Sequence, residues 1–247
     1  MIDSSFNTNE PQVLLQPMPF DCFEDRRERK KFIRKTFGYF LFSMLCTFST
    51  CIALNYSYSA KLFVNSVPGQ VITGLSQWGI IFIFCALMCF SDIFYHHIWK
   101  YVIYLILTIS ISWTLGLTTM YLPNKILLSS IFITTGTSLG LTTYSLVTEI
   151  DFTKYIEYYF VFFLTLILMS IVSIFINSSI LHICLAGGGS LLFSFFILSD
   201  IQMIIAQKHI RYKFNLNDSI FAAMNLYLDV INLFLYLIDC MIIGTQG

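Results

Sequence analysis

The chain has 247 residues, of which 57% are hydrophobic and 11% are charged. Soluble domains carry roughly 25% charged residues, so this composition, with a mean hydropathy of +0.75, excludes a soluble globular protein and indicates a multi-pass membrane protein. Lysine and arginine together number 14, as do aspartate and glutamate. The net charge therefore gives no reason to expect a nucleic-acid partner, and the lipid bilayer is the expected surrounding.

The N-terminal segment is polar and lacks the apolar core of a cleavable signal peptide. Residues 1–30 are expected to form a flexible cytosolic arm that ends in a basic cluster, and residues 31–247 a single transmembrane domain. The cluster continues to the first apolar run and comprises Arg26, Arg27, Arg29, Lys30, Lys31, Arg34 and Lys35. It is interpreted as a cytosolic anchor, with binding of anionic lipids as a secondary alternative.

Seven apolar runs follow, each near or above the length of about 20 residues that crosses the hydrocarbon core. The runs are 36–56, 76–94, 101–122, 126–148, 156–177, 180–207 and 219–243. They lack the alternation of polar and apolar residues that a barrel strand requires. The predicted fold is an all-α integral membrane protein with a bundle of seven transmembrane helices.

Basic residues sort the loops into two sides. With the N-terminus in the cytosol, twelve lysines and arginines fall on the cytosolic side, and only Lys61 and Lys125 on the other. The positive-inside rule therefore predicts a cytosolic N-terminus. The last helix should return the C-terminus to the lumen. A re-entrant last segment stays an alternative, because Asp229 and Asp239 weaken its apolar character.

Small and polar residues inside the bundle give three further expectations. Residues 136–140 (GTSLG) have the spacing of small residues that predicts close helix contact, with hydroxyl bonds between helices. Gly187, Gly188 and Gly189 predict either a kink or tight packing. Residues 149–154, which include Glu149, Asp151 and Lys154, are expected to form a solvated turn on the cytosolic side.

Two acids lie inside the last two apolar runs, where a charge costs several kcal/mol unless it is paired, hydrated or neutralised. Asp200 lies near the end of the sixth run and Asp229 near the middle of the seventh. At 1.5 Å per residue, both are expected about 10–15 Å from the cytosolic ends of their helices. Neighbouring antiparallel helices could therefore bring Asp200 and Asp229 together.

A pair of carboxylates in a medium of low dielectric constant cannot easily be doubly ionised. Asp200 and Asp229 are thus interpreted as a proton-sensitive latch. A shared proton would hold the helices together, and double ionisation or a cation bound between the acids would separate them or change a permeation path. The alternative is a hydrogen-bonded pair that fixes helix register without gating.

Other polar residues accompany Asp229 along the last helix. Asn225, Asn232 and Tyr236 follow helical spacing on its face and predict a polar stripe that turns away from lipid. Asp239, near the lumenal end, is a candidate acid at the mouth of an ion pathway, and an exposed interfacial acid is the alternative.

Four segments together resemble the transmembrane Bax inhibitor motif family, also called lifeguard proteins. They are residues 32–35 (FIRK), 151–153 (DFT), 199–202 (SDIQ) and 221–235 (FAAMNLYLDVINLFL). The resemblance covers about residues 26–243, and the last segment is the most specific. The short basic N-terminus is similar to the Golgi anti-apoptotic protein branch or its viral relatives.

This resemblance implies a fold of six helices around a central one. It implies residence in the Golgi or endoplasmic reticulum, with the plasma membrane as an alternative. It also implies a pH-sensitive calcium leak and suppression of apoptosis. It implies that Asp200 and Asp229 form a di-aspartyl sensor. No cofactor and no firmly bound metal are expected. Calcium is the expected permeant or regulatory ion, with these two acids as candidate ligands, and membrane proteins of apoptosis or calcium signalling are candidate partners.

The sequence departs from the family pattern in ways that bear on this mechanism. Some members pair the sensor with an arginine of the second helix, but no basic residue lies between Lys61 and Lys100. This favours a shared proton or a bound cation. Ser199 replaces the tyrosine that precedes the acid in many relatives, and Asp239 replaces a residue that is often basic.

The sequence leaves two alternatives to the leak channel. The first is a non-conducting anti-apoptotic protein that acts by binding other membrane proteins. The second is an intramembrane aspartyl protease, which also places two aspartates on adjacent helices. Its Tyr-Asp and Gly-x-Gly-Asp patterns are not found around Asp200 and Asp229, so no enzyme activity is expected.

Overall fold

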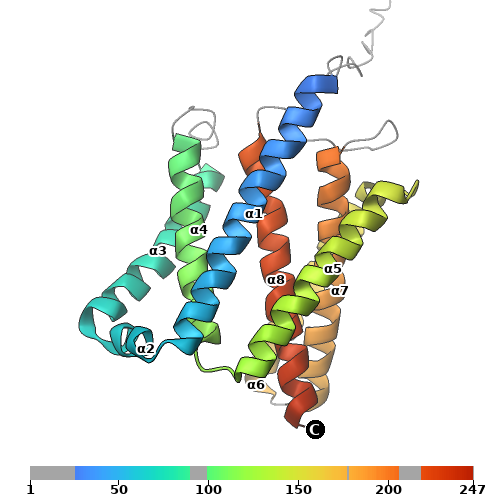
Figure 1. The fold of residues 1–247 in the computed structure, drawn as a ribbon. Helices are drawn as coiled ribbons and strands as arrows, with labels where there is room; N and C mark the ends of the chain where they lie inside the picture. Colours follow the sequence, from blue (N-terminus) through green and yellow to red (C-terminus); the bar gives the residue numbers. More distant parts are fainter. Residues whose placement is uncertain (1–25, 90–98, 177, 206–217, 247) are drawn as a thin grey trace, which may run out of the picture.

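The computed structural model describes residues 26–89, 99–176, 178–205 and 218–246, and almost all of them are helical (Figure 1). The elements are α1 (Arg26–Tyr56), α2 (Tyr58–Asn65), α3 (Val67–Cys89), α4 (Trp99–Thr119), α5 (Asn124–Val147), the 3₁₀ helix η2 (Phe152–Tyr155), α6 (Ile156–Phe175), α7 (Ser179–Ile205) and α8 (Ser219–Gln246). The predicted all-α bundle is confirmed. The expected flexible arm at residues 1–25 lies outside the described residues, and the basic cluster already belongs to α1.

Within the described residues, six helices are long and apolar enough to cross a membrane. These spans are Arg27–Tyr56, Trp99–Thr119, Asn124–Val147, Phe152–Phe175, Ser179–Ile205 and Ser219–Thr245. They confirm a multi-pass membrane protein. The run expected at 76–94 falls on the later part of α3 and continues outside the described residues, so the count of seven spans stays a prediction.

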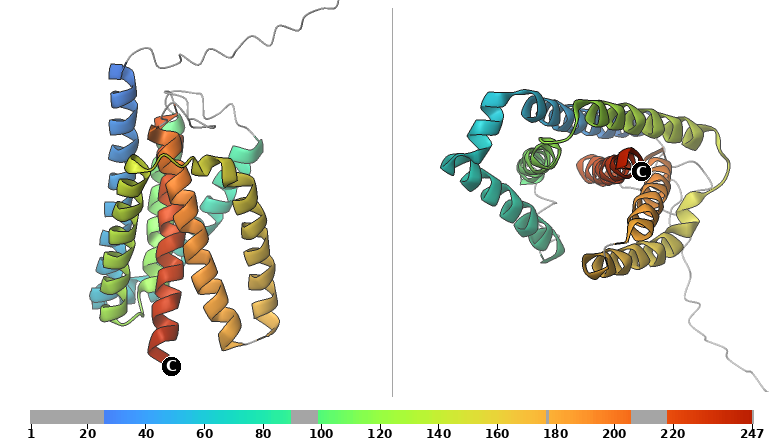
Figure 2. Two further views of the ribbon diagram at one scale, coloured as in Figure 1. Left: turned by 90° about the vertical axis from the view of Figure 1, so that its right-hand side faces the viewer. Right: turned by 90° about the horizontal axis from the view of Figure 1, so that it is seen from below.

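Helix α8 lies in the middle of the bundle. It packs against α1, α4, α5 and α7, and a view along the bundle shows it with these helices around it (Figure 2). Leu226, Val230 and Phe234 are almost completely buried, because this segment is apolar on most of its circumference. The helix is continuous from Ser219 to Gln246, which agrees with a spanning last segment rather than a re-entrant one.

The described basic residues separate to opposite ends of the bundle. The basic end, at the top of Figure 1, is defined by residues 26–35 of α1, Lys100 at the start of α4, and Lys154 in η2. Lys61 and Lys125 lie at the other end, called here the C-terminal end because α8 finishes there. This is the division that the sequence predicted, and its assignment to cytosol and lumen stays a prediction.

Side-chain caps order the C-terminal end. Helix α2, which no apolar run predicted, begins where the Ser57 side chain accepts a hydrogen bond from the Ala60 amide at 3.2 Å. Asn55 on α1 donates from Nδ2 to the carbonyl oxygens of Thr119 at 2.9 Å and Leu122 at 3.0 Å. Asn55 therefore joins α1 to the last carbonyl of α4 and to the turn that follows it.

The expectation of close helix contact along residues 136–140 is wrong. A Cβ added at Gly136 or Gly140 would meet no other heavy atom within 4 Å, and Leu139 between them is 65% exposed. Thr142 and Thr143 bond back to carbonyls of their own helix. This face of α5 points away from the bundle, and hydroxyls on an outward face satisfy themselves within the helix.

Helix α7 continues through all three glycines. The tight-packing alternative is confirmed at Gly188 and Gly189, whereas Gly187 has open space. A Cβ at Gly189 would overlap the ring of Tyr236 on α8, and one at Gly188 would lie 3.1 Å from Leu166 on α6. Gly189 therefore sets the approach of α7 to the central helix.

Candidate functional site

Asp200 and Asp229 face one another across the interface of α7 and α8. Asp200 lies five residues before Ile205, where the described part of α7 ends, and Asp229 ten residues after Ser219, where α8 begins. These intervals correspond to about 8 Å and 15 Å of helix. The two carboxyl groups are close enough to interact electrostatically, so the structure brings the predicted pair together.

The surroundings of the pair offer little to balance its charge. Asp200 is buried, with 8% of its surface exposed, whereas Asp229 is partly exposed. Among the described residues, Asp200 Oδ2 is buried without a hydrogen-bond partner, and neither acid forms an ion pair. Burying an unpaired carboxylate costs several kcal/mol, so this oxygen needs a proton, a cation or a water molecule as its partner.

The opposite face of α8 is held by hydroxyl groups. Thr47 on α1 donates its hydroxyl hydrogen to the carbonyl oxygen of Ser43 at 2.9 Å. The hydroxyls of Tyr227 on α8 and Ser112 on α4 lie 2.8 Å and 2.9 Å from Thr47 Oγ1. Since Thr47 has already used its single hydrogen, Tyr227 and Ser112 donate to it. Three helices thus meet at one buried oxygen.

A polar cavity of about 500 Å³ lies between α6, α7 and α8 towards the C-terminal end. Its polar lining consists of Ser170, Ser173, His182, Asn232, Tyr236 and Asp239. Two members of the predicted stripe, Asn232 and Tyr236, therefore face a shared space, as does the exposed Asp239. Asn225 is partly exposed and does not line this cavity.

Two features give the cavity its chemistry. Asp239 and His182 interact electrostatically, which places an acid and a titratable base at the same opening. Asn232, deeper in the helix, donates from Nδ2 to the carbonyl oxygen of Leu228 at 2.8 Å, so its side-chain oxygen stays available as an acceptor. Asn232 is one turn from Asp229, and the polar face of α8 thus extends from the cavity to the acid pair.

Calcium takes six to eight oxygen ligands, and the pair alone supplies at most four. No group of three or more His, Cys, Asp or Glu side chains that could hold a metal occurs among the described residues. Asp200 and Asp229 could bind calcium only together with water or amide oxygens.

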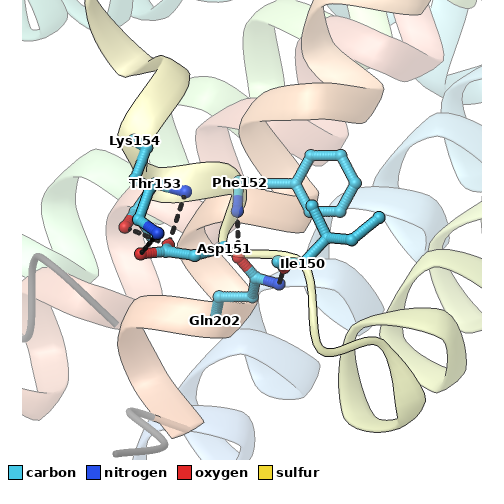
Figure 3. Close-up of polar contacts among 6 residues, drawn as sticks. All are labelled: Ile150, Asp151, Phe152, Thr153, Lys154 and Gln202. Atoms are coloured by element: carbon cyan, nitrogen blue, oxygen red, sulfur yellow. Dashed lines mark hydrogen bonds and ion pairs between the residues drawn. The ribbon is translucent and has the colours of Figure 1, made fainter. Parts of the chain in front are cut away.

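The solvated turn expected at residues 149–154 is confirmed for Glu149 and Lys154, which are exposed. It is wrong for Asp151, which is buried where Gln202 fixes this loop to α7 (Figure 3). Gln202 Nε2 donates to the Ile150 carbonyl oxygen at 2.7 Å, and Oε1 accepts from the Phe152 amide at 2.8 Å. Asp151 and Thr153 are buried. We call Gln202 with residues 150–152 the loop clamp.

The loop also carries its own cap. Asp151 Oδ1 accepts from the Thr153 amide at 3.1 Å and from its hydroxyl at 2.5 Å, which starts η2. Lys154 Nζ lies 3.9 Å from Asp151 Oδ2. The sequence contained the signal for the loop clamp: a glutamine in an apolar helix needs partners for its donor and its acceptor, and Gln202 is two residues from Asp200.

Together, the fold and the site define a class: helical multi-pass membrane proteins in which a central helix and its neighbour each carry a carboxyl group at their shared interface. The family model described as "Inhibitor of apoptosis-promoting Bax1" matches residues 29–246. The chain therefore belongs to the Bax inhibitor-1 family, which confirms the resemblance found in the sequence. Members of this family are generally non-enzymatic membrane proteins.

The chain is similar to the Golgi anti-apoptotic protein of Vaccinia virus in strains Lister, LC16m0 and LC16m8. Each relative is 28% identical over 220 residues, which cover 88% of this chain and 87% of the relative. The similarity therefore extends over most of the chain.

Proposed function

We propose that this protein is a pH-sensitive calcium leak channel, or a regulator of calcium, in an intracellular membrane, and that it thereby suppresses apoptosis. Membership of the Bax inhibitor-1 family supports the anti-apoptotic role. One observation supports the proposed mechanism above the others. It is the buried Asp200 oxygen that has no partner among the described residues and lies at the interface with the helix of Asp229.

In this mechanism the pair is a sensor of protons and cations. With one shared proton, one carboxyl group donates to the other and α7 stays packed on α8. When the pH rises and the proton leaves, two negative charges face one another where little water can screen them, and the α7–α8 interface is destabilised. A calcium ion that enters the opened interface would bind both carboxylates and replace the proton as the balancing charge.

The polar cavity supplies the second half of the proposed route. Asp239 would attract cations at its opening, and Asn232 and Tyr236 would offer oxygens towards the pair. The bundle would conduct only when α7 and α8 move apart, because Gly189 on α7 packs tightly against Tyr236 on α8 beside this cavity.

The test is calcium flux into liposomes that contain the purified full-length protein, measured across a range of pH. Wild-type flux is expected to rise as the pH is raised through the titration of the pair. Asp200→Asn and Asp229→Asn should each abolish this dependence, because neither variant can place two charges at the interface. Glu157→Gln is the matched control, since Glu157 is an exposed acid at the basic end.

Unchanged pH dependence in both aspartate variants would reject the sensor. Absence of flux from correctly folded wild-type protein would reject the channel and would leave the non-conducting interaction protein as the remaining candidate. Suppression of cell death by a wild-type protein that carries no flux would point to the same conclusion.

The proposed location is the Golgi or the endoplasmic reticulum, with the N-terminus in the cytosol. The name of the viral relatives, Golgi anti-apoptotic protein, supports the Golgi location. The cluster of basic residues at one end of the bundle supports the cytosolic N-terminus. The test is protease digestion of an N-terminal tag after selective permeabilisation of the plasma membrane. We expect the protease to digest the tag. A protected tag would contradict the orientation.

A further inference from the structure

An apolar groove lies between α1 and α4 at the basic end and takes no part in the proposed calcium route. Its volume is about 510 Å³. Its lining residues are Lys35, Gly38, Tyr39, Phe42, Tyr101, Tyr104 and Leu105. Phe42 and Leu105 are 48% and 44% exposed, and a Cβ at Gly38 would meet no heavy atom within 4 Å. The groove is therefore open along its length.

The chemistry of the groove changes along one face of α1. Lys31, Lys35, Tyr39 and Phe42 follow one another at spacings of four, four and three residues, which places them in a line on the helix. Lys31 and Lys35 are exposed. The line thus begins with two cations and continues with two aromatic rings that border the groove.

A third cation reaches the mouth of the groove from α4. The Lys100 ammonium lies 5.5 Å from the centre of the Tyr101 ring, and Tyr101 lines the groove. Lys35 and Lys100 are the last basic residues before the apolar parts of their helices. Since basic and aromatic side chains gather where a membrane helix leaves the hydrocarbon, the mouth lies at headgroup level and the groove lies among acyl chains.

The floor of the groove offers little to a polar ligand. The Tyr104 hydroxyl donates to the carbonyl oxygen of Tyr39 at 2.7 Å, and it accepts from Ser43 at 2.7 Å. Its hydrogen is therefore already used within the bundle. An occupant needs a hydrocarbon portion for the groove and a negative charge for Lys31, Lys35 and Lys100.

We propose that the groove between α1 and α4 is a binding site for an anionic phospholipid, with its phosphate held by Lys31, Lys35 and Lys100 and one acyl chain along Gly38, Tyr39 and Phe42. The charge complementarity at the mouth distinguishes this site from ordinary contact with bulk lipid. The inference stands independently of calcium conduction.

The test is a titration of the purified full-length protein with dioleoyl phosphatidic acid, followed by native mass spectrometry. Dioleoyl phosphatidylcholine, which has the same acyl chains, is the reference lipid. Lys31→Gln/Lys35→Gln should bind phosphatidic acid about thirtyfold more weakly, because each basic residue at a membrane surface contributes about 1 kcal/mol.

Gly38→Leu tests the groove without a change of charge. The leucine side chain should displace about two acyl methylenes from the groove. The lost burial of these methylenes should weaken binding about tenfold. Leu105→Trp fills the same groove from α4 and replaces Gly38→Leu if that variant does not fold. Gly136→Leu is the matched control, because Gly136 is also an open helical glycine. Lys61→Gln/Lys125→Gln is the control for charge.

Weaker binding by the charge variant and by a groove variant, with both controls unchanged, is the expected result. Wild-type affinity in both folded groove variants would overturn the assignment and leave only surface electrostatics. Competition by glycerol 3-phosphate as strong as that by the lipid would also overturn it, because the acyl chain would then contribute nothing.

Discussion

The loop clamp gives a prediction whose size follows from its two hydrogen bonds. Gln202→Met keeps the length of the side chain and removes the donor to Ile150 and the acceptor for Phe152. A neutral hydrogen bond contributes about 1 kcal/mol net, so the loop should lose about 2 kcal/mol of stability against local opening. This corresponds to about thirtyfold faster exchange of the Phe152 amide hydrogen.

Hydrogen–deuterium exchange of the purified protein, followed by mass spectrometry of peptides that contain Phe152, measures this opening. In Gln202→Glu an ionised carboxylate still accepts from Phe152, but a second oxygen replaces the donor and faces the Ile150 carbonyl oxygen. Its exchange should be faster than that of wild type by about fivefold or more, as expected for one lost bond with added repulsion. Gln70→Met is the control, since Gln70 is exposed on α3 and its bond to Asn65 is long, at 3.5 Å.

Exchange of the Phe152 amide at the wild-type rate in Gln202→Met would refute the reasoning. It would mean that the buried Asp151 and Thr153 hold the loop without the clamp. Faster exchange throughout α7 would also contradict a local clamp, because the change would then have destabilised the helix.

Two further substitutions test the packing of α8. Gly189→Ala should lower the free energy of unfolding of the detergent-solubilised protein by about 1–3 kcal/mol, because the added methyl group overlaps Tyr236. Gly187→Ala, at a glycine with open space, should leave this free energy unchanged or raise it. Equal effects of the two substitutions would contradict the packing argument. Tyr227→Phe should cost about 1 kcal/mol through loss of the bond to Thr47, and a melting temperature equal to that of wild type would show that this bond contributes nothing.

The sequence predicted the features that depend on hydrophobicity and helical period. Apolar runs placed the helices, because lipid leaves the backbone no alternative. The depth of Asp200 and Asp229 followed from counting residues at 1.5 Å each, and the structure brings the two together. Helical spacing also placed Asn232 and Tyr236 on one face, and both line one cavity.

Features that depend on the partner of a side chain could not be predicted in this way. The spacing of Gly136 and Gly140 is that of a packing motif, but it does not show which way α5 is rotated, and both face outwards. The charge of Asp151 suggested solvent, but the partners that bury it come from its own turn and from Gln202, about 50 positions further along the chain.

The polar contacts of α8 indicate which interface would yield if the acid pair became charged. On one face, Tyr227 donates to Thr47, which also receives a bond from Ser112, so α8 is joined to α1 and α4 by satisfied hydrogen bonds. On the face towards α7, the buried Asp200 oxygen has no partner among the described residues. An added charge raises the energy of the unsatisfied interface and leaves the satisfied one unaffected. The moving part should therefore be α7, and because Gln202 fixes the Ile150–Phe152 loop to α7, that loop should move with it.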